Sequence, residues 1–361
     1  MRNRYFVHFS YQEEAVPWDP LNQELKEVSS YFTTIFRHIE QALAGEGLTF
    51  HLTWKLDRIP STGRDVVAVV MADEWAQMPS YATDVLCTFK CYGAQVWMDT
   101  AVGDLTQASG WATLARDLRV GVARLPRWLR YRARMQGALG TPAYRPVYPL
   151  PLGYGNQEAL PIQPMSERTT DVFFAGSVQH AEGEPTGIRQ WIRSPKELSR
   201  TSMLRHLDAT AAEHDLAIDL KLNNRFVLNA IGYGLARPGE VYSAEEYSRR
   251  LMNSKICLAP RGTSLETYRY YEGLRYGCVV ITEPQPAHWF YRDAPAITVR
   301  NWRELQDLIP YLLAHPDVLE QLHRDGRAWW NEVVSEEAIG AYMIDCIKAQ
   351  RKIQTTAPTA L

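Results

Sequence analysis

The sequence predicts an α/β protein with two doubly wound domains, each a parallel sheet flanked by helices. Apolar segments of strand length alternate with segments of helical period along the chain. The length of 361 residues is more than one hydrophobic core usually supports. Six prolines between residues 141 and 168 mark an extended linker. We expect the domains to face a cleft, and the chain to divide into a first domain, a linker, a second domain and a terminal helix with its tail (residues 1–145, 146–168, 169–330 and 331–361).

The first half is expected to contain four strands and one long amphipathic helix. The helix should cover residues 23–43, where six apolar side chains recur near the 3.6-residue period. Strands that alternate with helices usually pair in parallel, so one doubly wound sheet is expected here. The strand candidates are residues 5–9, 48–54, 66–71 and 95–98.

The second half shows the same alternation, with cap patterns that mark helix starts. Ser194 followed by Pro195 and Glu197, and Ser243 followed by Glu246, are such patterns. Helices should continue to about residue 350, and we expect residues 327–348 to cross back to the first domain. The strand candidates are residues 170–175, 217–222, 256–259, 278–281 and 296–299.

Residues 256–282 carry the most informative pattern, a strand, a tight turn, a helix and a second strand. The turn is Pro260-Arg261-Gly262, and Thr263 or Ser264 is expected to cap the helix, with Glu266 completing a capping box. Free backbone N–H groups and the helix dipole favour an anion at a helix start. The arginine of the turn adds a fork of donors suited to phosphate. The pattern therefore predicts a site for a phosphorylated ligand.

Arg269 and Glu272 lie three residues apart, so they share one face of the predicted helix. Arginine before glutamate is the less favourable order for the helix dipole, so an intrahelical ion pair explains them poorly. Either they contact a ligand, or they form a surface salt bridge worth less than about 1 kcal/mol. The two residues alone leave both interpretations open.

This block resembles the signature of the exostosin family, glycosyltransferases of the heparan-synthesising and plant cell-wall type. The resemblance is specific over residues 250–283, where Asn253-Ser254-Lys255 also resembles the family's lead-in, and residues 1–140 carry no part of it. It implies a GT-B architecture of two Rossmann-like domains, with a nucleotide diphosphate sugar in the second domain and the acceptor in the first. The matching residues are Cys257, Leu258, Pro260, Arg261, Gly262, Leu265, Arg269, Glu272, Leu274 and Cys278.

The resemblance also implies roles for individual residues. Arg261 would bind the donor diphosphate and stabilise the charge left on it when the glycosidic bond breaks. Gly262 would let the backbone approach the phosphates closely. Glu272 would accept hydrogen bonds from ribose or sugar hydroxyls, and Arg269 would orient Glu272 or reach the phosphate.

Six further residues are candidates because they open the helix or follow strand ends. The hydroxyls of Thr263 and Ser264, at the helix start, would either donate to phosphate oxygens or only cap the helix. The small residues Gly176 and Ser177, after the strand candidate 170–175, would either lie against the diphosphate or form a plain turn. Thr282 and Glu283 end the strand after the helix and should line the same cleft, in a role left open.

An inverting transfer, as in the exostosin family, needs a general base for the acceptor hydroxyl. We expect this base at a strand end of the first domain. Glu74 and Asp73 follow the strand candidate 66–71 in this way and are preferred. Each is also compatible with a loop charge or a packed polar residue. The rivals are His8, Asp99 and Asp104.

Composition and local motifs argue against nucleic-acid binding, a metal site and a membrane span. A net charge of −2 gives no reason to expect nucleic-acid binding, and five scattered cysteines predict a reduced compartment. Cys87 and Cys91 lack the second ligand pair of a zinc site. No Asp-x-Asp pair follows a strand, so no metal is expected, and no other cofactor. No apolar run reaches about 20 residues, and residues 5–10 are too short for a signal-peptide core, so a cytoplasmic protein is expected.

A basic run begins at Arg116 and ends at Arg134, with apolar residues interspersed. It would dock on an anionic membrane surface, hold an acidic acceptor, or simply be an amphipathic helix with a solvated basic face. Pro126 is expected to divide it into two helices.

The preferred function is that of an inverting, metal-independent glycosyltransferase. It would move a sugar from a nucleotide diphosphate sugar, with UDP-sugars favoured, to a hydroxyl of a glycan or small acceptor. A nucleotide-sugar epimerase on the same architecture and a non-catalytic glycan-binding relative are the alternatives. A dinucleotide oxidoreductase is disfavoured, because no Gly-x-Gly-x-x-Gly follows a strand: the run from Gly232 has Arg237 in the place of the third glycine.

Overall fold

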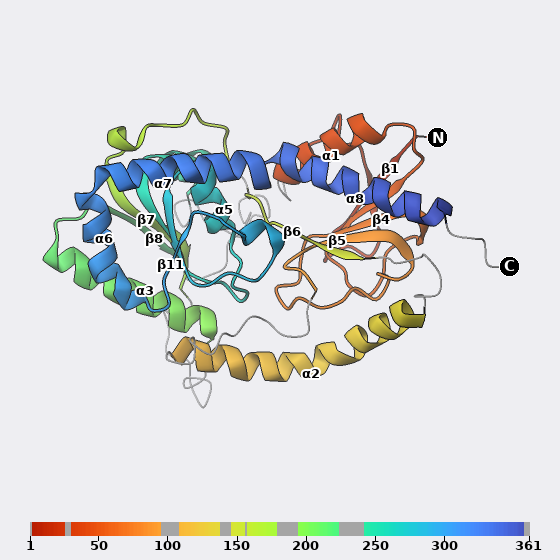
Figure 1. Cartoon of the computed structure of the whole chain (residues 1–361), viewed down its shortest axis with the longest axis horizontal. Helices are drawn as coiled ribbons and strands as arrows, with labels where there is room; N and C mark the ends of the chain where they lie inside the picture. The colour runs from red at the N-terminus through yellow and green to blue at the C-terminus, as the bar shows by residue number, and fades with distance from the viewer. Residues whose placement is uncertain are drawn as a thin grey trace.

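The computed structural model describes residues 2–25, 30–94, 108–137, 146–155, 157–178, 194–223 and 242–356. These residues form two parallel sheets with their helices, which lie side by side along the long axis of the molecule (Figure 1). The predicted fold class, α/β with two doubly wound, Rossmann-like domains, is confirmed. One apolar core extends from the first domain through the terminal helices into the second, and another lies on the opposite face of the second sheet.

The first sheet has the order β2-β1-β3-β4-β5-β6. Its neighbours pair in parallel except for the short edge strand β2, which is antiparallel to β1. Helices α1 (Ser30–Leu43) and α8 (Glu336–Thr356) pack on one face. The strands are β1 (Arg4–His8), β2 (Val16–Trp18), β3 (Thr49–Thr53), β4 (Gly63–Val70), β5 (Val85–Cys91) and β6 (Val147–Leu150).

Three of the four strands predicted for this half are confirmed as β1, β3 and β4, and the fourth, residues 95–98, lies outside the described residues. Strand β5 escaped prediction because Thr88 and Lys90 interrupt its apolar run, although both side chains are buried. The helix predicted over residues 23–43 starts too early. Residues 21–23 donate to Asp19 in a turn instead, so their N–H groups are used outside any helix.

The linker predicted over residues 146–168 also starts too early, because residues 147–150 form β6 and pair with β5. Pro149 is tolerated there since β6 is an edge strand. Further along, Gly153 has a φ of +63°, and a Cβ on it would lie 2.2 Å from Cδ1 of Tyr31 on α1. Only glycine fits this position.

The second sheet is entirely parallel, with the order β11-β10-β9-β7-β8, and all five predicted strands are confirmed. Both predicted caps are present: Ser194 Oγ accepts from Glu197 N at 3.2 Å and Ser243 Oγ from Glu246 N at 3.1 Å. The elements are β7 (Thr170–Ser177), α3 (Pro195–Glu213), β8 (Ile218–Asn223), α4 (Ala244–Met252), β9 (Ser254–Ala259), α5 (Tyr268–Arg275), β10 (Val279–Thr282), β11 (Ile297–Thr298) and α6 (Leu305–Ala314).

The prediction that Pro126 divides the basic run into two helices is wrong. Residues Ala108–Gly137 form one helix, α2, which follows a curved path beneath both domains (Figure 1). Thr113 and Asp117 are buried near one end, and Arg124 and Met135 further along. Packing at both ends therefore outweighs the loss of one backbone hydrogen bond at the proline.

The chain returns to the first domain at its end. Helix α7 (Pro316–Trp329) is followed by a π-helical turn (Trp330–Val334) and then α8. Hydrogen bonds that attach this segment to the first domain and the linker include Tyr31 Oη to Val334 O (2.6 Å), Tyr154 Oη to Glu336 Oε1 (2.5 Å) and Gln350 Nε2 to Tyr148 Oη (3.1 Å). The two domains are thereby held together on the side opposite α2 (Figure 1).

All five cysteines are free, and four of them are buried. No helix in the described part of the chain is long and apolar enough to cross a membrane.

Candidate functional site

The signature turn follows β9, but the helix after it begins later than predicted. Helix α5 starts at Tyr268, and neither Thr263 nor Ser264 caps it. Ser264 Oγ instead accepts from Glu266 N at 3.3 Å, and the carbonyl of Thr263 accepts from two arginine side chains. Residues 260–267 therefore form a loop and not the start of a helix. We call these residues the signature loop. An anion here would meet side chains and loop backbone, not the first turn of α5.

Arg261 is buried, with 4% of its surface exposed, and its contacts cross the domain boundary. Its Nη1 donates to Thr113 Oγ1 on α2 at 2.5 Å, and its Nη2 to Thr263 O at 3.4 Å. Its backbone N–H donates to Glu283 Oε2 at 2.9 Å. The predicted cleft residue Glu283 therefore fixes the backbone of the signature arginine.

Three further cations surround the end of β7. Arg200 Nη1 donates to Ser177 O at 2.6 Å, and its Nε to Arg261 O at 3.1 Å. Lys196 Nζ donates to Ser177 Oγ at 2.8 Å. Arg269 Nε donates to Ala175 O. We call Lys196, Arg200, Arg261 and Arg269 the cation cluster; sequence analysis found only the two arginines of the signature block.

Crowding in the cation cluster changes its acid–base behaviour. Burial, together with the charge of Arg200, lowers the pKa of Lys196 to about 8. Burial, and then the charge of Arg269, lowers the pKa of Arg200 well below its usual value. A bound anion would relieve this repulsion, because each cation would gain an opposite charge.

Because Gly176 has no side chain, the guanidinium of Arg269 has room beside it. A Cβ at Gly176 would lie 2.3 Å from Nη2 of Arg269, so any side chain there would displace the guanidinium. The guanidinium also lies over the Phe174 ring, 4.9 Å from its centroid. The prediction that Gly176 and Ser177 form a turn is wrong, because they are the last two residues of β7 and pair with β8, but these small residues do contact the cation cluster.

Glu74 of the first domain faces the signature loop. Its Oε1 lies 4.0 Å from where a Cβ of Gly262 would be, and the nearest atom to that point is Ser264 O at 3.7 Å. The charge of Glu74 also raises the pKa values of Lys196 and Arg200, against the larger effect of burial. The packing of the two domains therefore brings the preferred base candidate next to the signature block.

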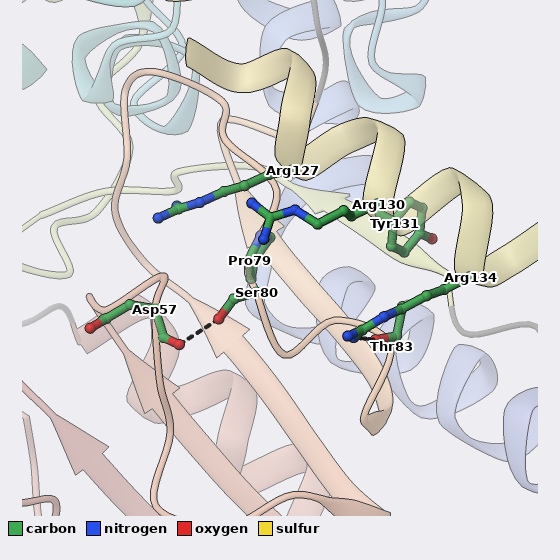
Figure 2. A pocket seen from close by; sticks show the side chains of 8 residues that line it. All are labelled: Asp57, Pro79, Ser80, Thr83, Arg127, Arg130, Tyr131 and Arg134. Atoms are coloured by element: carbon green, nitrogen blue, oxygen red, sulfur yellow. Dashed lines mark hydrogen bonds between the residues drawn. The ribbon is translucent and has the colours of Figure 1, made fainter.

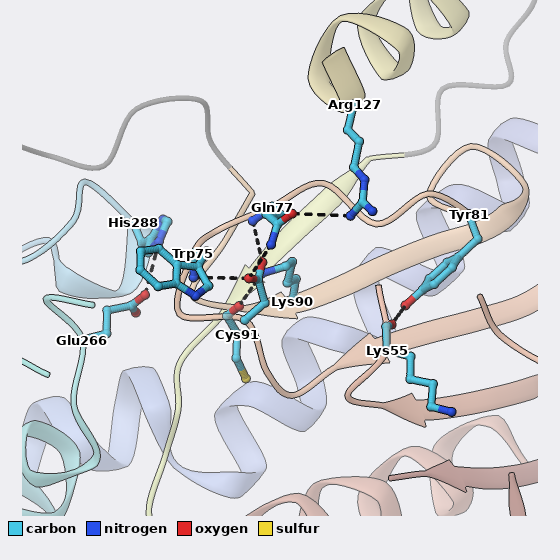
Figure 3. Close-up of polar contacts among 10 residues, drawn as sticks. Lys55, Trp75, Gln77, Tyr81, Lys90, Cys91, Arg127, Glu266 and His288 are labelled. Carbon is cyan, nitrogen blue, oxygen red and sulfur yellow. Dashed lines mark hydrogen bonds and ion pairs between the residues drawn. The ribbon is translucent and has the colours of Figure 1, made fainter. Parts of the chain in front are cut away.

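Asp73 has a different environment, because it contacts Gln77 and Lys90, whose side chains are labelled in Figure 3. Its carboxylate accepts from Gln77 N at 2.5 Å and lies 3.3 Å from Nζ of Lys90, whose side chain is fully buried. Its backbone φ is +84°, in the left-handed region. These contacts hold the turn that follows β4, and the Asp73 side chain is only 5% exposed.

Glu272 is also buried and is engaged within the protein. Its Oε2 accepts from Tyr247 Oη at 2.7 Å and its Oε1 from the backbone N–H of Gly155 at 3.3 Å. Burial raises the pKa of this carboxyl. A donor hydroxyl would have to replace one of these two hydrogen-bond donors.

His288 lies where the two domains meet and was not found by sequence analysis. Its Nε2 is 3.8 Å from Glu266 Oε2, and its ring covers Gly93 of the first domain, where a Cβ would be 2.6 Å from His288 Cε1. Burial, followed by the charge of Lys90, lowers the pKa of His288 to about 4. The imidazole is therefore neutral near pH 7. No residue pattern around it signals this position.

The other base candidates are placed elsewhere. His8 is buried and its Nε2 lies 3.0 Å from Glu13 O, while Asp99 and Asp104 lie outside the described residues.

Thr282, predicted to line the cleft, is buried and its Oγ1 donates to Ala259 O at 3.0 Å. Within the described residues, no three His, Cys, Asp or Glu side chains gather as metal ligands do.

Two well-defined cavities in the described part of the chain contain no residue of the signature block. One, of about 290 Å³, lies between α2 and the first domain, where Arg130 and Arg134 extend toward Ser80 and Thr83 (Figure 2). The other, of about 440 Å³, lies at β1 and β2.

No protein-family model matches the chain, and no curated protein shows a significant sequence match. Among solved structures, the chain is similar to sucrose-phosphate synthase from Thermosynechococcus elongatus, with 14% identity, coverage of 98% of this chain and 100% of that one, and a TM-score of 0.46. It is also similar to a GtfA/B complex (11% identity, 90% of this chain, 61% of that one, TM-score 0.40). A third is the glycosyltransferase of kitacinnamycin (9% identity, 96% and 98%, TM-score 0.38). Similarities of this extent support no conclusion about activity, which must come from the site itself.

Proposed function

We propose that this protein is a glycosyltransferase that binds a nucleotide diphosphate sugar at the cation cluster and passes the sugar to an acceptor hydroxyl. One observation carries the proposal. Three cations from α3 and α5 donate to the end of β7, the backbone carbonyl of Arg261 accepts from one of them, Arg200, and a carboxylate from the other domain, Glu74, faces the signature loop. The carboxyl ends of parallel strands are where such sheets bind ligands.

In this proposal the cation cluster replaces a metal ion. As the bond between the anomeric carbon and the diphosphate breaks, negative charge develops on the leaving phosphate, and Arg261, Arg269 and Lys196 stabilise it. Preorganised donors of this kind are each worth about a hundredfold or more in rate. Gly262 would let the backbone N–H groups of the loop approach the phosphate oxygens.

Glu74 is the proposed general base. The acceptor oxygen forms a bond to the anomeric carbon while its proton passes to the Glu74 carboxylate, so one displacement inverts the anomeric centre. Asp73 is less suited, because its carboxylate is held by Lys90 and Gln77. His288 is also less suited, because burial disfavours protonation of its imidazole.

The finer assignments rest on the sequence alone. The exostosin-like subfamily, the preference for UDP-sugars and a cytoplasmic location belong to this proposal. Glu272 would contact the donor ribose only if Gly155 of the linker or Tyr247 released it. Donor binding and linker movement would then be coupled.

The test is calorimetric binding of UDP, GDP, ADP and CMP, with EDTA present, to the wild type and three variants. Arg261→Ala removes a charge of the cluster. Gly262→Ala is sterically mild, because the nearest atom to its new Cβ is 3.7 Å away. Arg324→Ala, on the exposed face of α7, is the matched control.

Selective binding of one diphosphate, weakened about tenfold or more by Arg261→Ala and Gly262→Ala but not by Arg324→Ala, would support the donor site. Equal binding by all four proteins would refute it. With the binding nucleotide known, incubation of its sugar conjugates with acceptors separates the alternatives. Transfer supports the proposal, an epimerised donor without acceptor indicates the epimerase, and binding without turnover indicates a non-catalytic relative.

A further inference from the structure

Helix α2 presents an apolar stripe to solvent. Its five members are 42–75% exposed although each is a large apolar residue. Their spacing of seven, four, three and four residues places them on one side of the helix. The opposite side is the one that packs on the protein, through Thr113, Asp117, Arg124 and Met135. The stripe consists of Trp111, Leu118, Val122, Leu125 and Leu129.

Every charged side chain that α2 exposes to solvent is an arginine. The helix contains seven arginines and one acidic residue, Asp117, which is buried and pairs with Arg116 at 3.2 Å. Arg119 and Arg130 flank the stripe on one side and Arg132 on the other, and all three are exposed. The stripe therefore lies between rows of unopposed positive charge.

The position of α2 makes this face accessible along its length. The helix forms the outer edge of the molecule and passes beneath both domains (Figure 1). With 30 residues it extends about 45 Å. The stripe, from Trp111 to Leu129, covers about 27 Å of this length.

We propose that this face of α2 lies in the headgroup region of an anionic lipid bilayer. The stripe would insert among the acyl chains, and Arg119, Arg130 and Arg132 would contact the anionic headgroups. An amphipathic helix with arginine beside an apolar face binds membranes in this orientation. A second copy of the chain fits less well, because pairing two such faces would bring arginine against arginine. The proposal is independent of the proposed glycosyl transfer.

The test is co-sedimentation of the full chain with vesicles of phosphatidylcholine alone or with added phosphatidylglycerol. Leu118→Asn/Val122→Asn removes apolar surface from the stripe, and Arg119→Gln/Arg130→Gln/Arg132→Gln removes the flanking charge. Tyr311→Asn, which changes a side chain 50% exposed on α6, and Arg324→Gln on α7 are the matched controls. Circular dichroism and thermal unfolding check that each variant folds.

We expect binding to anionic but not neutral vesicles, weakened by salt. The apolar double variant should lose about tenfold or more in partitioning, and the arginine variant about fivefold for each charge removed, while both controls bind as the wild type. Absence of binding to anionic vesicles, or equal binding by all folded variants, would overturn the proposal. So would a vesicle-independent dimer that Leu118→Asn/Val122→Asn dissociates, because the stripe would then be a contact between copies.

Discussion

The guanidinium of Arg261 donates a hydrogen bond to the hydroxyl of Thr113 across 2.5 Å, although 148 positions separate them in the chain. Thr113 belongs to α2, which the chain forms between β5 and β6 of the first domain, whereas Arg261 follows β9 of the second. Arg261 is thus oriented by α2, a helix that lies far outside the signature block in the sequence.

The first prediction concerns this contact. Thr113→Val preserves the shape of the side chain but removes the hydroxyl, so it should lower the free energy of unfolding by about 1–3 kcal/mol. Thr113→Ser retains the hydroxyl and should stay within about 1 kcal/mol of the wild type. Urea denaturation measures both. Equal stability of the valine and serine variants would show that the hydrogen bond contributes nothing.

The adjacent acids Asp73 and Glu74 should respond differently. Asp73→Asn leaves the fully buried Lys90 without its counter-charge and should cost about 3–5 kcal/mol of stability. Glu74→Gln should change stability by less than about 1 kcal/mol but lower kcat about 10²–10⁴-fold, because the proposed base is lost. Denaturation and turnover are measured on both variants. Wild-type kcat in Glu74→Gln would remove Glu74 from the mechanism.

Gly176→Ala should weaken donor binding with little loss of stability. The new Cβ would displace the end of the Arg269 side chain, which is flexible enough to move at low cost. The displaced guanidinium can no longer hold a phosphate, so we expect diphosphate affinity to fall about tenfold or more. A double-mutant cycle with Arg269→Ala checks the cause. Additive losses would show that Gly176 does not act through Arg269.

Affinity for the diphosphate should depend on pH through Lys196. The lysine, with a pKa of about 8, is charged below this pH and becomes neutral as the pH rises through it. Anion affinity should therefore be highest near pH 7 and fall above pH 8. Its charged neighbours are Arg200 on the same helix, Arg269 on α5 and Glu74 of the first domain.

Calorimetry between about pH 7 and 9.5 tests this, since the phosphate groups stay ionised in that range. Lys196→Arg remains charged throughout and should give a nearly flat profile. The same decline in both proteins would assign the pH dependence to another group.

Local patterns were sufficient for most of the regular structure. Alternating apolar strands and the caps at Ser194 and Ser243 act over a few residues, so they can be recognised without the fold. Prediction failed where long-range packing overrode a local signal. Examples are Lys90 buried within β5, and Pro126 inside one continuous helix.

The sequence by itself determined two parallel α/β domains and the βαβ unit with Arg261, Gly262, Arg269 and Glu272, because strand period and motif spacing are local properties. Only the tertiary structure decided that Lys196 and Arg200 join Arg261 at the end of β7, that Glu74 rather than Asp73 faces Gly262, and that Glu272 is engaged by Tyr247 and the linker. These relationships join segments far apart in the chain. They depend on which buried surfaces fit when the domains dock, and no local pattern carries that information.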